Sequence, residues 1–129
     1  MEQSFTLTAL VTDAMTAKQV GSGELPVLGT PVMIAFMEKA AASCLKTSLG
    51  EGQTSVGIDI SVKHVAATSV ADTVKVQAVL TERDERRAIF SVRAWDSTGL
   101  IGEGIHIRAI VDVEKFMKRA NEKLPSDNI

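Results

Sequence analysis

The sequence has few of the residues that mark secreted or membrane proteins. Its 129 residues include one cysteine, three prolines, one tryptophan and no tyrosine. A single cysteine excludes an internal disulfide, so Cys44 is expected to be a packing thiol in a buried helix rather than a nucleophile. No run approaches the roughly 18 apolar residues of a membrane span, and the N-terminus lacks the basic and apolar regions of a signal peptide. We therefore expect a soluble, cytoplasmic protein without a membrane partner.

The charge balance is also small. The formal net charge is -2, with acids and bases interspersed, and nucleic acid as a main partner would require a basic face. A few local cations could still hold an anionic ligand. Because 45% of the residues are hydrophobic and the chain is short, the sequence predicts one domain with its own core, spanning residues 1–129.

Alternating apolar and polar residues predict five strands. The connections between the last four are short, and the clusters RDER and DSTG carry turn-forming residues. Short connections favour an antiparallel meander. The predicted strands cover residues 5–11, 53–66, 72–82, 87–96 and 100–113.

One long helix is predicted between the first and second strands. Thr30 fits the N-cap, Pro31 fits the first helical position, and Gly50 ends the helix. Residues 12–29 before it are small and polar, as in a surface segment near a site. A short amphipathic helix is expected over residues 113–124.

Together these elements predict an α+β fold in which a curled five-stranded antiparallel sheet wraps around the long helix. An open sheet leaves edges that can pair with a second copy, so a symmetric homodimer is expected, with a tetramer as an alternative.

Two residues of the predicted helix could carry chemistry. Glu38 shares its stripe with apolar residues, so it needs a cationic partner on an exposed strip or a catalytic role. Thr30 is explained by capping, and capping also places its hydroxyl where free backbone donors stabilise a developing oxyanion. On an ideal helix the two residues lie roughly 12 Å apart along the axis, far enough to flank one substrate.

The chain has two histidines. If alternation is unbroken, His64 shares the helix-facing side of its strand with Val56, Ile58, Ile60 and Val62. It is either a core histidine or, with Glu38, half of an acid/base pair. His106 lies on the face of its strand that also carries Arg108, which favours a structural or substrate-side role.

Several classes of site are excluded. The sequence has no His and Cys ligands at metal spacing, no GxxxxGK[ST] loop and no G-x-S-x-G elbow. The glycines of VGSGELP have no βαβ context, so they are a weak phosphate-loop candidate.

Three segments resemble a known family: VGSGELPVLGTPVMIAFMEKAA, EGQTSVGIDISVKHVAAT and GLIGEGIHIRAIVD. They are similar to the hotdog thioesterases related to fluoroacetyl-CoA thioesterase, and the resemblance runs from about Leu7 to Phe116. It implies a hotdog fold and hydrolysis of a small or medium acyl-CoA, with no cofactor beyond the CoA of the substrate. The sequence departs from the family pattern in GSGELPVLG, where the fluoroacetate-specific enzyme carries phenylalanines that form a lid. We therefore expect this protein to act on an acyl group other than fluoroacetyl.

The resemblance also implies site residues. The family's Thr, Glu and His fall on Thr30, Glu38 and His64, and its strand glycine falls on Gly57, where the missing side chain lets the backbone approach substrate. The carbonyl oxygen would be polarised by backbone N–H donors, and His64 would manage the proton for the departing thiolate.

An acyl-CoA would lie at the dimer interface. Its acyl chain would follow a wall of Met33, Ile34 and Met37, with Arg108 as a substrate-side cation. Other candidates for the CoA phosphates are Lys63, Arg86 and Arg87.

Two rival functions can be built on the same fold. A non-catalytic acyl-CoA or small-ligand binding protein would leave the thioester intact. An enoyl-CoA hydratase would need an Asp and His pair at the helix entrance, and VLGTPV has neither.

Overall fold

Five antiparallel strands pair in the order β1-β3-β4-β5-β2, so that β1 and β2 form the two edges of one sheet. The computed structural model describes residues 3–125. The strands are β1 (Ser4–Leu10), β2 (Gln53–His64), β3 (Thr73–Arg83), β4 (Arg87–Asp96) and β5 (Gly99–Asp112). All five predicted strands are confirmed, with ends that differ by at most two residues, and so is the α+β class that they build with the helices.

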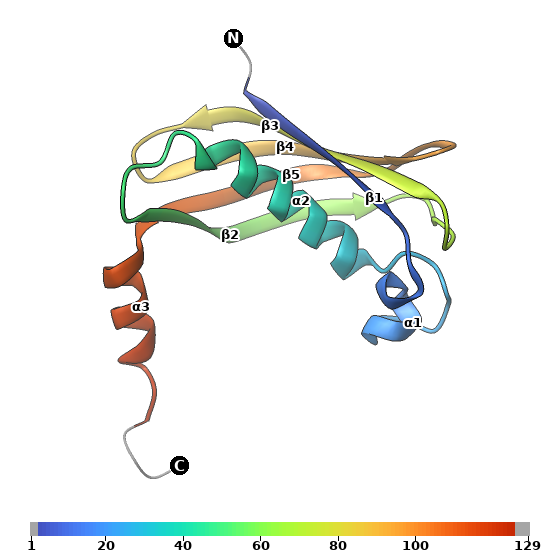
Figure 1. Ribbon diagram of the computed structural model, residues 1–129, viewed down its shortest axis with the longest axis horizontal. Coiled ribbons are helices and arrows are strands. Elements are labelled where there is room, and N and C mark those ends of the chain that lie inside the picture. The colour runs from blue at the N-terminus through green and yellow to red at the C-terminus, as the bar shows by residue number, and fades with distance from the viewer. Residues whose placement is uncertain (1–2, 126–129) are drawn as a thin grey trace.

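The long helix α2 (Thr30–Lys46) crosses the concave face of this sheet (Figure 1). Its Met33, Met37 and Leu45 have almost no exposed surface and pack with β3 and β4 side chains such as Phe90. Burial of this apolar surface is the main force that holds the helix in the sheet. Near its start α2 approaches β5 closely, because the Met33 thioether lies where a Cβ of Gly102 would stand.

The predicted helix ends were inexact. Gly29 is the N-cap and Thr30 is already helical, with no side-chain capping bond at this end. At the other end the helix stops at Lys46 with Thr47 as C-cap, before the predicted Gly50. The Thr30 hydroxyl is therefore not used as a cap and is available to another group.

The side-chain alternation of β2 breaks at a β-bulge. Gly57 pairs with Arg108 and Asp59 with Ile107, which leaves Ile58 unpaired between them. The prediction that Val56 and Ile58 share a face with His64 was wrong, because a bulge reverses the faces on either side of it. Before the bulge Gly57 faces α2, while Ile58 is 49% exposed.

Residues 12–29, predicted to be a surface segment, contain the short helices η1 (Asp13–Met15) and α1 (Ala17–Val20). Hydrogen bonds between backbone groups hold this segment against the start of α2. Ala17 N–H donates to Val27 O (2.8 Å) and Gly29 N–H donates to Met15 O (2.9 Å). The Thr16 hydroxyl caps α1 by accepting from Gln19 N–H at 3.2 Å.

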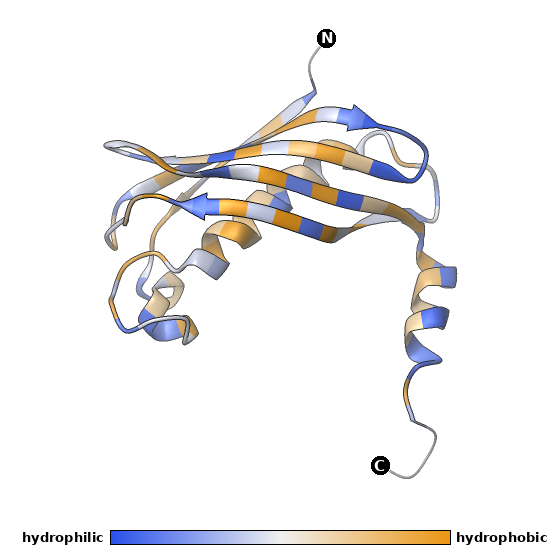
Figure 2. Ribbon diagram, turned by 180° about the vertical axis from the view of Figure 1, so that it is seen from behind, coloured by the Kyte–Doolittle hydropathy of each residue, from blue (hydrophilic) through white to orange (hydrophobic). Residues whose placement is uncertain are grey.

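The last helix, α3 (Val113–Asn121), leaves the end of β5 and points away from the sheet (Figures 1 and 2). Asp112 caps it by accepting from Lys115 N–H at 3.0 Å. The hydropathy colouring shows an apolar and a polar side, and Phe116 and Met117 are 40% and 48% exposed. Within residues 3–125, no helix is both long enough and apolar enough to cross a membrane.

Candidate functional site

Thr30 and His64 meet at the junction of α2 and β2. Thr30 is the first residue of α2 and His64 the last of β2, and 2.7 Å separates Thr30 Oγ1 from His64 Nδ1. Burial lowers the pKa of His64 below its usual 6.5, so the imidazole is neutral at neutral pH. A neutral imidazole bonded to a hydroxyl can both accept and donate a proton.

His64 Nε2 is a buried polar atom, and the residues that the structure describes offer it no hydrogen-bond partner. The same side chain lines a pocket of about 350 Å³ between the start of α2, the end of β2 and the segment before α2. A buried nitrogen without a partner costs free energy unless a ligand satisfies it. The pocket is lined by Ala17, Ser22, Val27, Leu28, Thr30, His64, Val65, Ala66 and Ala67.

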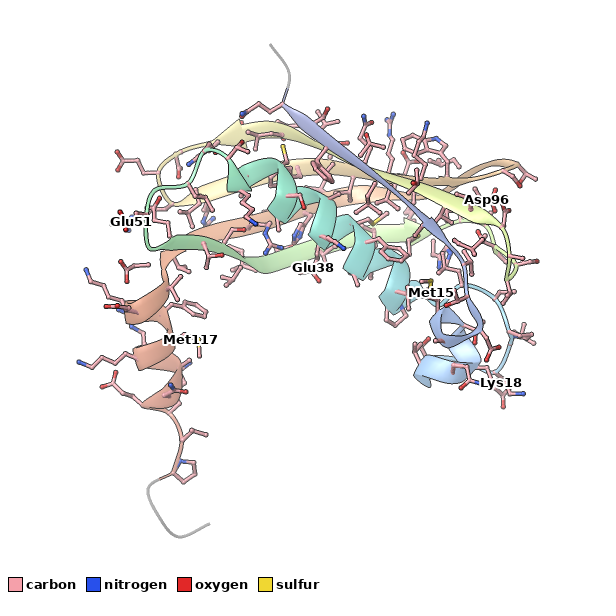
Figure 3. The ribbon with its side chains drawn as sticks, in the orientation of Figure 1. Met15, Lys18, Glu38, Glu51, Asp96 and Met117 are labelled. Atoms are coloured by element: carbon pink, nitrogen blue, oxygen red, sulfur yellow. The ribbon has the colours of Figure 1, made fainter. Side chains whose placement is uncertain are left out.

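Glu38 lies two turns further along α2, above the middle of β2 (Figure 3). Its carboxylate occupies the space that a Cβ of Gly57 would need. Arg108 Nη1 lies 3.6 Å from Glu38 Oε2, and the Arg108 side chain is only 9% exposed while that of Glu38 is 43% exposed. Glu38 thus has the cationic partner that a carboxylate in this setting needs, and it also remains open to solvent or a ligand.

Arg108 is held by groups on its own strand β5 and on the neighbouring strand β2. Its Nε–H donates to Ser55 Oγ (2.9 Å), its Nη2 to Ser55 O (3.0 Å), and its Nη1 lies 3.1 Å from His106 Nε2. Burial lowers the pKa of Arg108, and the neighbouring Glu38 carboxylate opposes that shift. Because its guanidinium is buried and hydrogen-bonded to Ser55 and His106, Arg108 is a partner of Glu38 and not an exposed cation for CoA phosphates.

The structure divides the predicted site residues into two groups that lie apart from each other. Thr30 and His64 form one pair, and Glu38, Gly57 and Arg108 form a second cluster. Gly57 and His64 are seven residues apart on one strand, or about 23 Å at the usual rise per residue. Within one chain these two groups cannot act on the same carbonyl carbon.

The acyl wall predicted on α2 is only partly available. Met33 and Met37 have no exposed surface, because both point into the core against the sheet. Ile34 is half-buried and remains a candidate. The predicted phosphate-binding residues Lys63, Arg86 and Arg87 are exposed.

Sequence reasoning missed Ser55 and the bulge at Ile58. The signal for the bulge was present, since a glycine inside a strand pattern often marks one. Ser55 carried no comparable signal, because its importance comes from Arg108 on a neighbouring strand. Within residues 3–125 no group of three His, Cys, Asp or Glu side chains could hold a metal ion.

The chain is similar in sequence to known thioesterases. Residues 11–114 match the family model described as fluoroacetyl-CoA-specific thioesterase. The fluoroacetyl-CoA thioesterase of Streptantibioticus cattleyicolor is 37% identical over 100 residues, covering 78% of this chain and 72% of that protein.

Solved structures agree in fold. A variant of the fluoroacetyl-CoA-specific thioesterase in complex with fluoroacetate and CoA is 32% identical, with a TM-score of 0.89 over 94% of this chain and 99% of that one. A hot-dog-like protein from Thermanaerovibrio acidaminovorans, at 23% identity, has a TM-score of 0.88 over 97% and 93% of the two chains and shows the shared fold. The chain therefore has the hotdog fold and belongs to the fluoroacetyl-CoA-specific thioesterase family.

Proposed function

We propose that this protein, an acyl-CoA thioesterase by family, hydrolyses a small or medium acyl-CoA with Thr30, His64 and Glu38 as its catalytic residues. The observation that carries the proposal is the Thr30–His64 hydrogen bond at the wall of a pocket. Beside it, the buried His64 Nε2 has no hydrogen-bond partner among the residues that the structure describes. The pocket volume of about 350 Å³ suits a short acyl group together with part of the pantetheine arm.

In the proposed reaction, water adds its oxygen to the thioester carbonyl carbon and the carbon–sulfur bond breaks. The positive end of the α2 dipole stabilises the developing oxyanion. The donor there is Thr30 N–H, because Pro31 has no N–H and those of Val32 and Met33 bond to Gly29 O. Neutral His64, hydrogen-bonded to Thr30, takes up the proton that the attacking water loses and passes it to the CoA thiolate, so the imidazole is neutral again at the end. The products are a carboxylic acid and free CoA, and no cofactor takes part.

Glu38 has two possible routes in this reaction. Its carboxylate either orients and deprotonates the attacking water or attacks the carbonyl itself to form an anhydride that water then opens. Single-turnover hydrolysis in ¹⁸O water separates the routes, because only the second places an enzyme oxygen in the product.

We further propose that the working enzyme is a cytoplasmic homodimer in which the free edge of β2 pairs with that of a second copy. The separation of the two groups supports this arrangement, since antiparallel pairing about a two-fold axis between Gly57 and His64 brings Glu38 of one copy toward the Thr30–His64 pair of the other. Each dimer would then contain two composite sites.

Mixing inactive variants tests this arrangement. In a mixed dimer of Thr30→Ala and Glu38→Gln chains, one of the two composite sites is intact. Random exchange makes half of the dimers mixed, so activity should return to about a quarter of the wild-type level. If all three residues acted within one chain, mixing would restore nothing.

The function itself is tested by CoA release, followed with a thiol reagent, against short, branched, aromatic and long acyl-CoAs. Turnover that disappears in Glu38→Gln would support the thioesterase and define its substrate class. CoA esters that raise the melting temperature of the wild type without being cleaved would instead support the binding-protein alternative.

A further inference from the structure

His106 is a buried titratable residue that takes no part in the proposed reaction. It lies on β5 with 1% of its surface exposed, on the side of the sheet that faces α2. Its imidazole lies beside Gly57, directly below the Glu38 carboxylate. A buried histidine at this place needs a physical reason, because an aliphatic side chain would fill the space without polar atoms.

Both ring nitrogens of His106 have partners, and the partners define its protonation state. Nδ1 lies 2.8 Å from the carbonyl oxygen of Asp59, which can only accept, so Nδ1 carries a proton. Nε2 lies 3.1 Å from Arg108 Nη1, which can only donate, so Nε2 must be unprotonated. The imidazole is therefore neutral, in its Nδ1–H tautomer.

The charged groups around His106 fit this state. Burial lowers its pKa most, and the charge of Arg108 lowers it further; the Asp59 carbonyl and the carboxylates of Glu38 and Asp59 oppose the shift. A second proton on Nε2 would face the Arg108 N–H directly.

The hydrogen bond from Arg108 to His106 completes a set of contacts that fixes the guanidinium. Ser55 holds Nε and Nη2, and His106 holds one N–H of Nη1. The other N–H of Nη1 is left for Glu38, 3.6 Å away. Because the five donors of a guanidinium lie in one rigid plane, loss of the His106 acceptor would free that plane to tilt.

We propose that His106 is a positioning residue, whose neutral imidazole fixes Arg108 and through it sets the Glu38 carboxylate over Gly57. The inference rests on the proposed function of Glu38. His106 also joins this cluster to the β2 bulge, because its Nδ1 partner, Asp59, is the first paired residue after Ile58. The bulge thus aims a carbonyl at the imidazole that orients the catalytic carboxylate.

The hydrogen-bond arrangement can be tested without turnover. The chain has two histidines, so ¹⁵N imidazole signals can be assigned with one His64 variant. At neutral pH, His106 should show the Nδ1–H tautomer, and the Arg108 Nε–H should exchange slowly with water. An Nε2–H tautomer or a protonated ring would overturn the proposal.

Two substitutions separate the acceptor from mere packing. Gln offers an amide oxygen at about the reach of Nε2, whereas Asn offers an amide nitrogen at about the reach of Nδ1. His106→Gln should keep kcat within about threefold of wild type, and His106→Asn should lower kcat about tenfold or more with little change in KM. The Arg108 Nε–H should exchange about tenfold faster in His106→Asn only.

A double-mutant cycle shows whether the effect passes through Arg108. In an Arg108→Met background, Gln and Asn at position 106 should give equal kcat, because the group being positioned is gone. Equal kcat and equal Arg108 exchange for the two variants in the wild-type background would refute the positioning role, as would a difference that persists without Arg108. Absence of wild-type turnover would refute the proposed function instead, and Arg108 exchange would still decide the role of His106.

Discussion

Two ion pairs of equal length lie on different sides of the sheet. Arg93 and Glu103 on the outer face approach to 3.6 Å with side chains 57% and 49% exposed. Arg108 and Glu38 on the inner face also approach to 3.6 Å, but Arg108 is buried and further bonded to Ser55 and His106. The difference teaches that the surroundings of an ion pair, and not the distance between its charges, decide its effect. Water screens the outer pair, while the inner pair holds the Glu38 carboxylate and the Arg108 guanidinium in one arrangement.

The sharpest test of this contrast is Glu38→Gln. It keeps the shape of the side chain but removes the charge that the proposed reaction needs, so kcat should fall about a hundredfold or more. The matched control is Glu103→Gln, which removes the carboxylate of the outer pair. If the two variants turned over acyl-CoA equally well, Glu38 would have no catalytic role.

A second test exchanges the two arginines for lysine. Arg108→Lys loses the planar fork that bonds Ser55 and His106 together, so kcat/KM should fall about tenfold and the melting temperature by several degrees. Arg93→Lys keeps a solvated cation and should change neither value. Steady-state kinetics and thermal unfolding of both variants provide the comparison, and equal effects would contradict it.

A third test adds one carbon atom beneath Glu38. The Cβ of Gly57→Ala would displace the Glu38 carboxylate from its place over β2, so kcat should fall about tenfold. Gly50→Ala is the control, because its Cβ would meet only the flexible end of Gln53. Wild-type kcat in a folded Gly57→Ala protein would show that Glu38 does not depend on this close approach.

The inner face should also be more sensitive to acid. Burial lowers the pKa of both His64 and His106 from 6.5 in the folded protein, so below about pH 6.5 the unfolded chain takes up protons more readily and stability is lost as the pH falls. kcat/KM should decline at lower pH than this onset, because the pKa of His64 in the folded enzyme is lowered and the imidazole stays neutral below pH 6.5. Thermal melts from about pH 7.5 down to about pH 5 should show a smaller loss in His64→Gln than in wild type, and an identical pH dependence would exclude His64 as a source.

The smallest effect is expected on the outer face. Glu103→Gln removes a screened pair between exposed side chains, so the free energy of unfolding should change by no more than about 0.5 kcal/mol. Chemical denaturation in low and high salt measures this change. A loss of several kcal/mol would mean that the outer pair is not screened in the way its exposure indicates.

Strand and helix positions could be predicted from the sequence because they depend on local patterns. Alternation over β3, β4 and β5 and the Thr30-Pro31 start of α2 are local signals, and they located each element within a few residues. The bulge at Ile58 was missed because an unbroken pattern was assumed past Gly57. That one residue decides which side chains of β2 face the helix.

The site was only partly predictable for a different reason. Thr30, Glu38 and His64 were identified from residue types and family resemblance, but their division into two groups depends on the distance between positions along β2. The roles of Ser55 and His106 depend on contacts between strands far apart in the sequence. Local patterns carry no information about such contacts.

Residues 12–29 form one wall of the pocket, and the way this wall is held has an evolutionary consequence. Hydrogen bonds between backbone groups hold it in place, including Ala17 N–H to Val27 O and Gly29 N–H to Met15 O. Backbone bonds do not depend on which side chains the segment carries. Pocket-facing residues such as Ser22 and Val27 can therefore be exchanged while the sheet and α2 stay unchanged, so descendants of one fold can acquire new acyl preferences by altering a single interchangeable segment.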